Sequence, residues 1–127
     1  MIYADNAATT ALDIDAFEAM KPYLLKEYGN ASQPYSFARS AKKALAAARK
    51  TIADCIGAQP EEIFFTSGGT ESDNWAIKGT LQYGDGRAIL TSQIEHHAIL
   101  NACASVERLG YPVVYLSVDQ KGVLTPA

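Results

Sequence analysis

The stretch IFFTSGGTESDN, residues 63–74, decides how the chain is interpreted. It starts with apolar residues typical of a buried strand and passes through a glycine turn into an amphipathic segment. Two further apolar runs follow at 88–90 and 113–116, each after a segment of helical length. This order predicts a β-α-β-α-β unit over 62–117 with parallel strands. The fold class is therefore predicted to be α/β, with a partial parallel sheet in a three-layer arrangement.

Helices are predicted on both sides of the glycine turn. Residues 13–28 begin with capping aspartates, and Pro22 is expected to break that helix. The segment 37–56 carries an apolar stripe at helical spacing, and Gly57 supplies its stop. The two helices of the β-α-β-α-β unit are expected to run through about 82 and through 109.

Composition narrows the classes of function. The chain has 127 residues, of which 48% are hydrophobic, enough for one domain with a core, so 1–127 is predicted to be a single α/β domain. With 14 acidic and 11 basic side chains and no dense basic run, nucleic acid is not an expected partner. No apolar run approaches the roughly 20 residues that cross a bilayer, and the start lacks a signal-peptide pattern, so no membrane contact and a cytoplasmic location are expected.

The cysteines and two of the lysines have no predicted chemical role. Cys55 and Cys103 are too few for a disulfide framework and lack the C-x-x-C spacing of a zinc or redox site. Each falls on an apolar helical stripe, so both are predicted to be free thiols packed in a core. Lys78 falls in a helix and Lys121 in a Gln-Lys-Gly turn, where both amines are expected to be solvated.

The last residues have the pattern of a helix start. Thr125-Pro126-Ala127 places a capping hydroxyl before a proline at the first helical position. A three-stranded parallel sheet would also leave long unpaired edges, which complete domains avoid. We therefore expect the chain to be the N-terminal part of a longer protein.

The turn at 66–70 is a candidate phosphate site. Its glycines allow close approach of a ligand, and the first turn of a helix offers unpaired N–H groups and a dipole that favours anions. The alternative is that Thr70 and Asp73 form a capping box and the glycines only make a tight turn, and the spacing alone does not decide. Because neither a Walker A loop nor a G-x-G-x-x-G pattern is present, a small phosphate ester is favoured over a nucleoside phosphate.

The second candidate site contains both histidines, His96 and His97. Adjacent side chains at a strand end point apart, so one imidazole can face a ligand while the other faces solvent or caps a helix. No metal is expected, because zinc needs three or four converging ligands and Cys103 lies on the apolar stripe with Ile99, Ala102 and Val106. The alternative is an ordinary loop histidine without a ligand.

Beyond these motifs, the whole chain resembles the start of a cysteine desulfurase, in the class V, fold-type I group of pyridoxal-phosphate enzymes. YADNAATT at 3–10 is similar to the family's opening, and GNAS at 29–32 to its early loop. Residues 66–74 resemble its phosphate turn, and EHHA at 95–98 the motif whose first histidine stacks on the cofactor. The motifs occur in the family's order, so the resemblance implies the N-terminal portion of a fold-type I large domain.

The resemblance implies a pyridoxal 5'-phosphate cofactor and assigns residues to it. Gly69 and Thr70 would hold the phosphate, and His96 would stack on the pyridine ring as a candidate acid or base. Residues 1–36 would form an N-terminal segment with an active-site loop. The residues implied to lie near the substrate are Ala8, Thr9 and Asn30.

The implied parent activity is removal of sulfur from L-cysteine, leaving L-alanine and a persulfide for iron–sulfur cluster or thio-cofactor assembly. The implied partners are L-cysteine, a second copy in a homodimer, and a sulfur-acceptor scaffold protein. The family's Schiff-base lysine and nucleophilic cysteine have no counterpart in these 127 residues. No catalytic residue is therefore assigned, and the chain alone is expected to be inactive.

Departures from the family pattern leave the subgroup open. In the early loop, Ala31, Gln33 and Tyr35 differ from the family's frequent residues. Two alternatives to a desulfurase also stay open. One is another class V enzyme, such as a selenocysteine lyase or an aminotransferase, and the other is a non-catalytic phosphate-binding fragment.

Overall fold

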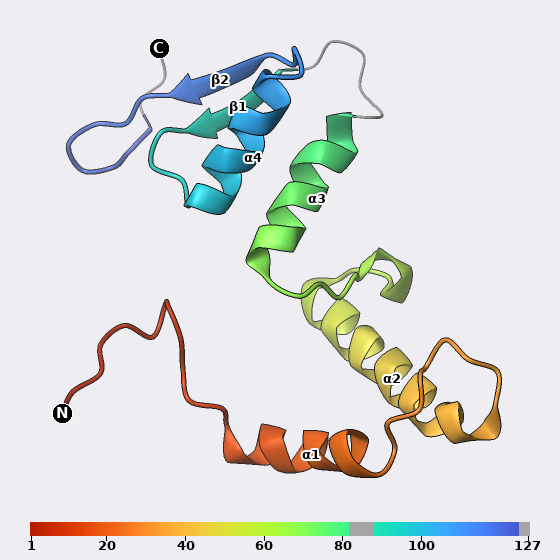
Figure 1. Ribbon diagram of the computed structural model, residues 1–127. Helices are drawn as coiled ribbons and strands as arrows, with labels where there is room; N and C mark the ends of the chain where they lie inside the picture. The colour runs from red at the N-terminus through yellow and green to blue at the C-terminus, as the bar shows by residue number, and fades with distance from the viewer. Residues whose placement is uncertain (82–87, 125–127) are drawn as a thin grey trace. The chain divides into compact units, whose positions relative to one another are not determined.

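The computed structural model describes residues 1–81 and 88–124 and shows an α/β chain of helices with a small parallel sheet (Figure 1). The α/β class predicted from the sequence is confirmed. The chain divides into two compact units, Met1–Phe64 and Phe65–Ala127, and each is described by itself. That 1–127 forms a single domain stays a prediction. None of the helices among the described residues is long and apolar enough to cross a membrane.

The first unit begins with helix α1, Ile14–Leu25. Asp13 caps it, because its carboxylate accepts two backbone N–H groups of the first turn, at 2.9 and 3.1 Å. Pro22 lies inside the helix, which continues to Leu25, so the predicted break is wrong. A proline removes one backbone donor, and here the helix ends within the next turn, so little hydrogen bonding is lost.

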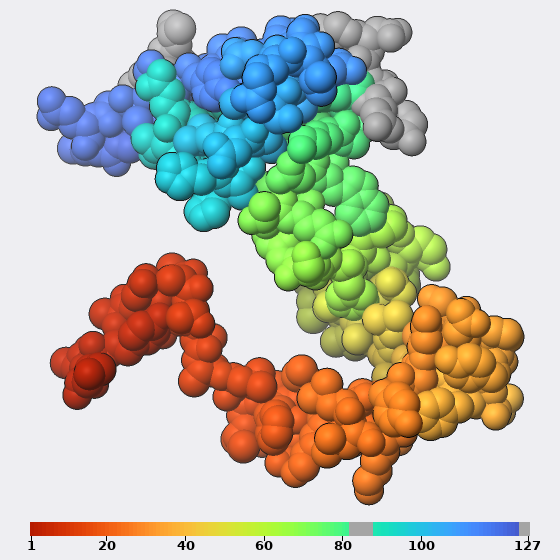
Figure 2. Space-filling model, in the orientation of Figure 1, coloured from red at the N-terminus to blue at the C-terminus, as the bar shows by residue number. Residues whose placement is uncertain are grey.

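No residue of α1 is buried. Its apolar positions Phe17, Met20 and Leu24 are 38%, 46% and 60% exposed. In the space-filling view the helix belongs to the red-to-orange part of the chain (Figure 2). The helix therefore carries an apolar face that nothing among the described residues of this unit covers.

Helix α2, Arg39–Ile56, follows a 3-10 turn, η1, at Ser36–Ala38. It ends at Gly57, whose φ of 70° lies in the left-handed region where glycine is least costly, so the predicted stop is confirmed. A second 3-10 turn, η2, spans Pro60–Glu62, and α2 packs mainly against the two turns.

The apolar stripe predicted for the second helix is largely exposed. Leu45 is 40% and Ile52 42% exposed, and Cys55 is exposed as well, so the prediction that Cys55 packs in a core is wrong. The buried apolar residues of this unit are the small Ala38 and Ala53. Two short turns cover too little surface to bury the stripe of a helix of 18 residues.

The strand predicted at 63–65 is not formed. The backbone of Ile63 is extended, with φ of -97° and ψ of 122°, but a strand needs a neighbour to pair its N–H and C=O groups. Among the described residues, the two-stranded sheet does not include this segment. The carbonyl of Ile63 instead accepts a hydrogen bond from Nε of Arg49 at 3.0 Å.

The second unit contains the remaining regular elements, which alternate between helix and strand. They are α3 (Gly69–Leu81), β1 (Ile89–Ser92), α4 (His97–Glu107) and β2 (Val113–Leu116). The two strands are parallel, with Ile89 opposite Val113, and α4 connects them (Figure 1). The last β-α-β of the predicted unit is therefore formed. The predicted helix end at about 82 and the helix-start pattern at 125–127 lie outside the described residues.

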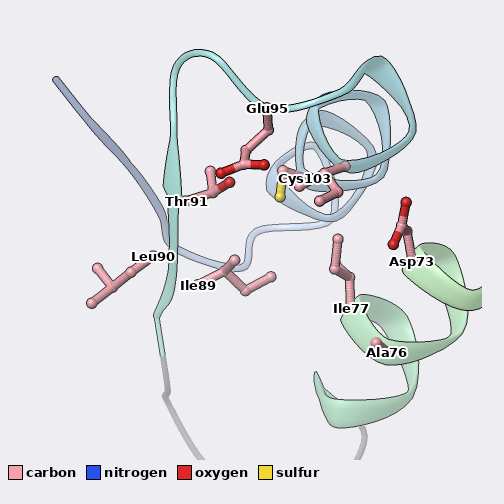
Figure 3. Close-up of a pocket in the computed structure, with 9 residues that line it drawn as sticks. Asp73, Ala76, Ile77, Ile89, Leu90, Thr91, Glu95 and Cys103 are labelled. Atoms are coloured by element: carbon pink, nitrogen blue, oxygen red, sulfur yellow. The ribbon is translucent and has the colours of Figure 1, made fainter. Parts of the chain in front are cut away.

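The core of the second unit is one face of α4. Its buried residues there are Ala98, Ala102, Cys103 and Val106, each at most 7% exposed. Cys103, at 0% exposure, is packed in a core as predicted. A cavity of about 310 Å³ remains between α3, β1 and α4 (Figure 3).

Candidate functional site

The glycine turn opens helix α3, which begins at Gly69. The carbonyl of Gly68 accepts the N–H groups of Glu71 and Ser72 at 3.1 and 3.2 Å. The N–H groups of Gly68, Gly69 and Thr70 have no acceptor among the described residues. A Cβ built on Gly68 or Gly69 would meet nothing within 4 Å, so neither glycine is crowded by its neighbours.

Side chains on both sides of the turn tie it to the helix. Oε2 of Glu71 accepts the backbone N–H of Ser67 at 2.6 Å and its hydroxyl at 2.7 Å. The hydroxyls of Thr66 and Ser72 lie 2.8 Å apart. The backbone N–H and then the hydroxyl of Ser67 lower the pKa of Glu71, because both stabilise the carboxylate.

The capping box considered for Thr70 and Asp73 is not formed. Within residues 1–81 and 88–124, neither side chain accepts the backbone N–H of the other residue, and the carbonyl of Thr70 accepts from Nδ2 of Asn74 at 2.9 Å. The capping carboxylate is Glu71, which the sequence reasoning missed. With the helix starting at Gly69, Glu71 is its third residue, the position where capping boxes carry a glutamate.

The donors of this turn fit an anion. Three unpaired N–H groups lie at the positive end of a helix of 13 residues, and the hydroxyl of Thr70 has no partner within the described part of the chain. The chemistry of this donor set therefore fits the phosphate of the pyridoxal phosphate that the resemblance implies.

His96 is the N-cap of α4. Its Nδ1 accepts the backbone N–H of Ala98 at 3.1 Å, so a neutral ring carries its proton on Nε2. His96 is therefore the histidine of the pair that caps a helix. His97 is the first residue of the helix, and the two ring centroids lie 6.2 Å apart at 52°.

Two hydrogen bonds hold the start of the loop that carries His96. Ser92, only 6% exposed, donates its hydroxyl to Oε1 of Glu95 at 2.8 Å. The N–H of Gln93 bonds to the carbonyl of Leu116 at 3.2 Å, which extends the pairing of β1 with β2. The start of α4 is therefore held by the sheet and by its own first residues.

The cavity beside this loop has mainly apolar walls. Its polar members are Asp73 from α3, Thr91 from β1, and Glu95 and Cys103, whose carboxylate and sulfur lie beside Thr91 (Figure 3). Burial, then the charges of Glu107 and Glu95, raise the pKa of Cys103, and a hydrogen bond from Thr91 lowers it. Cys103 is therefore a packed thiol and not a nucleophile.

The residues implied to lie near the substrate belong to the first unit and are exposed. The N–H groups of Ala8 and Thr9 turn back to the carbonyl of Asp5 at 3.0 and 3.4 Å. Asn30 accepts the N–H of Ser32 at 3.0 Å through Oδ1, which closes the early loop.

Glycine is required just before Asn30. A Cβ on Gly29 would lie 2.7 Å from the carbonyl oxygen of Phe37 and 2.9 Å from Cα of Ala38. Next to it, the rings of Tyr28 and Phe37 meet edge to face with centroids 5.2 Å apart. The early loop is thus packed closely against the start of η1.

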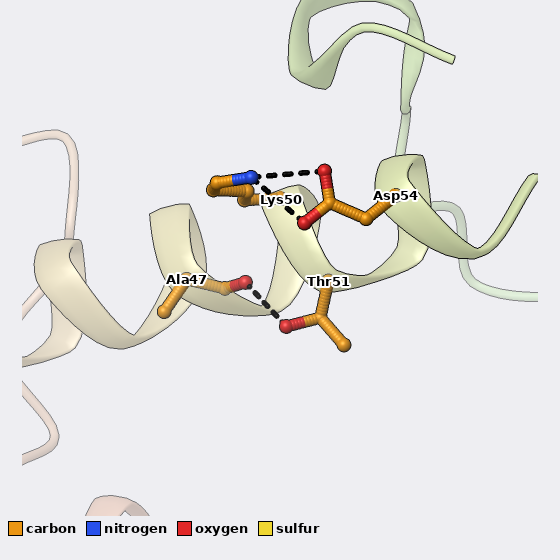
Figure 4. Close-up of polar contacts among 4 residues, drawn as sticks. All are labelled: Ala47, Lys50, Thr51 and Asp54. Carbon is orange, nitrogen blue, oxygen red and sulfur yellow. Dashed lines mark hydrogen bonds and ion pairs between the residues drawn. The ribbon is translucent and has the colours of Figure 1, made fainter. Parts of the chain in front are cut away.

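The lysines do not form a covalent cofactor site. Every lysine of the chain is exposed, including Lys78 and Lys121, as predicted. Lys50 pairs with Asp54 at 2.7 Å on the surface of α2, beside the bond from Thr51 to the carbonyl of Ala47 (Figure 4). In residues 1–81 and 88–124, no three His, Cys, Asp or Glu side chains gather in a way that could hold a metal ion.

Known proteins similar to this chain are named as cysteine desulfurases. The cysteine desulfurase IscS of Methanosarcina thermophila is 49% identical, over 98% of this chain and 31% of its own length. The putative cysteine desulfurase IscS 1 of Bacillus subtilis is 49% identical, over 95% of this chain and 32% of its own length. The chain thus spans about a third of the length of the curated relatives it matches.

Solved structures lead to the same family. A NifS-like protein superposes with a TM-score of 0.90 at 36% identity, over 95% of this chain and 34% of its own. A structure described as SspA in complex with cysteine has a TM-score of 0.82 at 40% identity, over 89% of this chain and 33% of its own. A sequence profile of the family Aminotransferase class-V matches residues 2–127. The chain therefore belongs to the class V aminotransferase family.

Proposed function

We propose that this chain supplies the phosphate-binding turn and the ring-stacking histidine of a pyridoxal-phosphate-dependent cysteine desulfurase. The observation that carries the proposal is the pair of unpaired N–H groups on Gly69 and Thr70 at the start of α3. This turn lies in a chain whose relatives at 49% identity are named cysteine desulfurase. When bound, pyridoxal phosphate supplies an electron sink for reactions at the substrate's α-carbon.

The residues of this chain would bind and orient the cofactor. Gly69 and Thr70 hold the phosphate through their N–H groups and the Thr70 hydroxyl. The ring of His96 would fix the cofactor plane through its flat face, because the Nδ1 lone pair that accepts from Ala98 lies in the ring plane and not over a face. The same bond occupies Nδ1, so Nε2 is the atom at which His96 can hold or donate a proton.

The proposed reaction takes sulfur from L-cysteine, leaves L-alanine and passes a persulfide to iron–sulfur cluster or thio-cofactor assembly. Ala8, Thr9 and Asn30 are proposed to lie near the substrate. The structural neighbour described in complex with cysteine supports this substrate class. The names of the relatives favour a desulfurase over a selenocysteine lyase or an aminotransferase.

A homodimer and a scaffold protein that accepts sulfur are the proposed partners, and the cytoplasm is the proposed location. The exposed apolar residues on α1 and on the stripe of α2 support self-association, because large apolar patches mark interaction surfaces. Sedimentation of the protein as its gene encodes it is expected to show a dimer. A stable monomer at high concentration would argue against that partner.

The activity is tested on the protein as its gene encodes it. Loaded with pyridoxal phosphate, it should release sulfide and alanine from L-cysteine in equal amounts when a reducing thiol is present. Turnover of L-selenocysteine but not L-cysteine would favour the lyase, and transfer of the amino group to a keto acid would favour an aminotransferase. Binding of the cofactor with none of these activities would favour the alternative that the chain is a non-catalytic phosphate-binding fragment.

A further inference from the structure

Glu71 has a position that the proposed cofactor site does not explain. Its carboxylate lies at the start of α3, where an anion is proposed to bind, and a single oxygen accepts both donors of Ser67, at 2.6 and 2.7 Å. Like charges repel, so a carboxylate next to a phosphate site weakens anion binding unless it contributes something else. The geometry of the turn shows what that contribution is.

The Ser67 bonds connect the chain before the helix to the helix's first turn. Without them, Ser67 would present another free N–H group, and the side-chain ties of the turn would be the hydroxyls of Thr66 and Ser72. With them, Ser67 is satisfied, and the N–H groups of Gly68, Gly69 and Thr70 stay unpaired within the part of the chain that the structure describes. A turn held in one conformation binds a ligand without the cost of ordering it.

We propose that Glu71 is a positioning residue, which closes the turn and leaves the N–H groups of Gly68, Gly69 and Thr70 to the anion. This role rests on the proposed phosphate site and deepens it. The hydrogen bonds that hold the carboxylate also lower the pKa of Glu71, so the closed turn and the ionised side chain support each other.

Two substitutions separate position from charge. Glu71→Gln removes the charge and keeps a carbonyl oxygen that can accept from Ser67, whereas Glu71→Ala removes both. Since neither variant repels phosphate, the comparison between them isolates the hydrogen bonds. We expect the Ala variant to bind phosphate roughly 5- to 10-fold more weakly than the Gln variant, the scale of one hydrogen bond between neutral groups.

The experiment uses the protein as its gene encodes it, freed of cofactor. Calorimetry gives Kd for inorganic phosphate and for pyridoxal phosphate, and spectra with ¹⁵N-labelled glycine report whether Gly68 and Gly69 respond to phosphate. Ser67→Ala loses the hydroxyl bond and keeps both the N–H bond and the charge of Glu71, so its Kd is compared with that of the unaltered protein and should be higher. The control is Glu61→Ala, because Glu61 is exposed on η2 and its side chain makes no hydrogen bond among the described residues.

The outcomes test the positioning role of Glu71 separately from the phosphate site at the glycine turn. If the unaltered protein binds neither probe at the glycine turn, the phosphate site and the role of Glu71 fail together. If both probes bind but the Ala and Gln variants share one Kd, the site stands and the positioning role is wrong. A weaker Ala variant rescued by Gln, with Glu61→Ala unchanged, supports the proposal.

Discussion

The imidazole of His96 caps helix α4, with Nδ1 accepting the backbone N–H of Ala98 at 3.1 Å. The ring that is proposed to stack on the cofactor is thus fixed by the protein before any ligand arrives. A side chain that caps loses little further freedom when it stacks, which favours binding. The two roles can be separated, because asparagine is a good N-cap and has no aromatic ring.

His96→Asn is expected to keep the cap, whereas His96→Ala should destabilise the protein by about 1 kcal/mol through loss of the cap. Both variants lose the ring and should bind pyridoxal phosphate more weakly. Urea unfolding measures the first effect and cofactor titration the second. An Asn variant with unchanged cofactor affinity would show that His96 acts only as a cap.

Thr70→Ala is expected to weaken cofactor binding by on the order of 1 to 2 kcal/mol, because one hydrogen bond to a charged group is lost. The free energy of unfolding should stay nearly constant, since the Thr70 hydroxyl has no partner within the described residues. Thr70→Ser keeps a hydroxyl and serves as the control. Equal Kd values for the Ala variant and the unaltered protein would contradict the phosphate role of the side chain.

Sequence patterns predicted the structure correctly where residues within the same segment determine it. Gly57 ends α2 because its φ of 70° suits glycine, and Asp13 caps α1 because its carboxylate reaches the first turn of the same helix. Cys103 is buried because it lies on the apolar face of its own helix. The motifs at 66–74 and 95–98 also identified the family that the comparisons then established.

Sequence patterns gave wrong predictions where the structure of a segment depends on residues outside it. Residues 63–65 have strand composition, but a strand exists only with a hydrogen-bonding neighbour. The cap of α3 depends on whether the helix starts at Gly69 or later, and that choice moves the capping role from Asp73 to Glu71. The apolar position of Cys55 could not show whether another element covers it.

Gly29→Ala should destabilise the protein by about 1 to 3 kcal/mol, the usual cost of an overpacked site. The new Cβ would lie 2.7 Å from the backbone oxygen of Phe37, and a backbone atom cannot move aside as the end of a long side chain can. Gly68→Ala is the matched control, because its Cβ would meet nothing within 4 Å. If urea unfolding gives the two variants the same stability, the close packing of the early loop is wrong.

The two cysteines should differ in reactivity. Cys55 is exposed and should react quickly with a thiol reagent, whereas Cys103 is buried and its raised pKa keeps it a thiol.

The stability of the protein should depend on the ionisation of Cys103. Because the pKa of Cys103 is higher in the folded than in the unfolded state, the folded state holds more protons at alkaline pH. The free energy of unfolding should therefore fall as the pH rises from the unfolded-state pKa to the folded-state pKa. Mass spectrometry of the labelled protein and unfolding at several pH values check both points. Cys103→Ala should flatten the pH dependence, and rapid labelling of Cys103 in the native protein would contradict its burial.

The 127-residue chain by itself is expected not to release sulfide or alanine from L-cysteine, even with excess pyridoxal phosphate. Covalent attachment of the cofactor needs a lysine held against its aldehyde in a site that excludes water. Every lysine of this chain is exposed, and Lys21 and Lys50 form ion pairs with Glu18 and Asp54. Cys103 is buried, and its raised pKa keeps it a thiol. The test adds pyridoxal phosphate, reduces with borohydride, maps any labelled lysine by mass and assays sulfide in parallel. Scattered, substoichiometric labelling without sulfide is the expected result. Stoichiometric labelling of one lysine with L-cysteine-dependent sulfide release would show that these residues alone are catalytically complete.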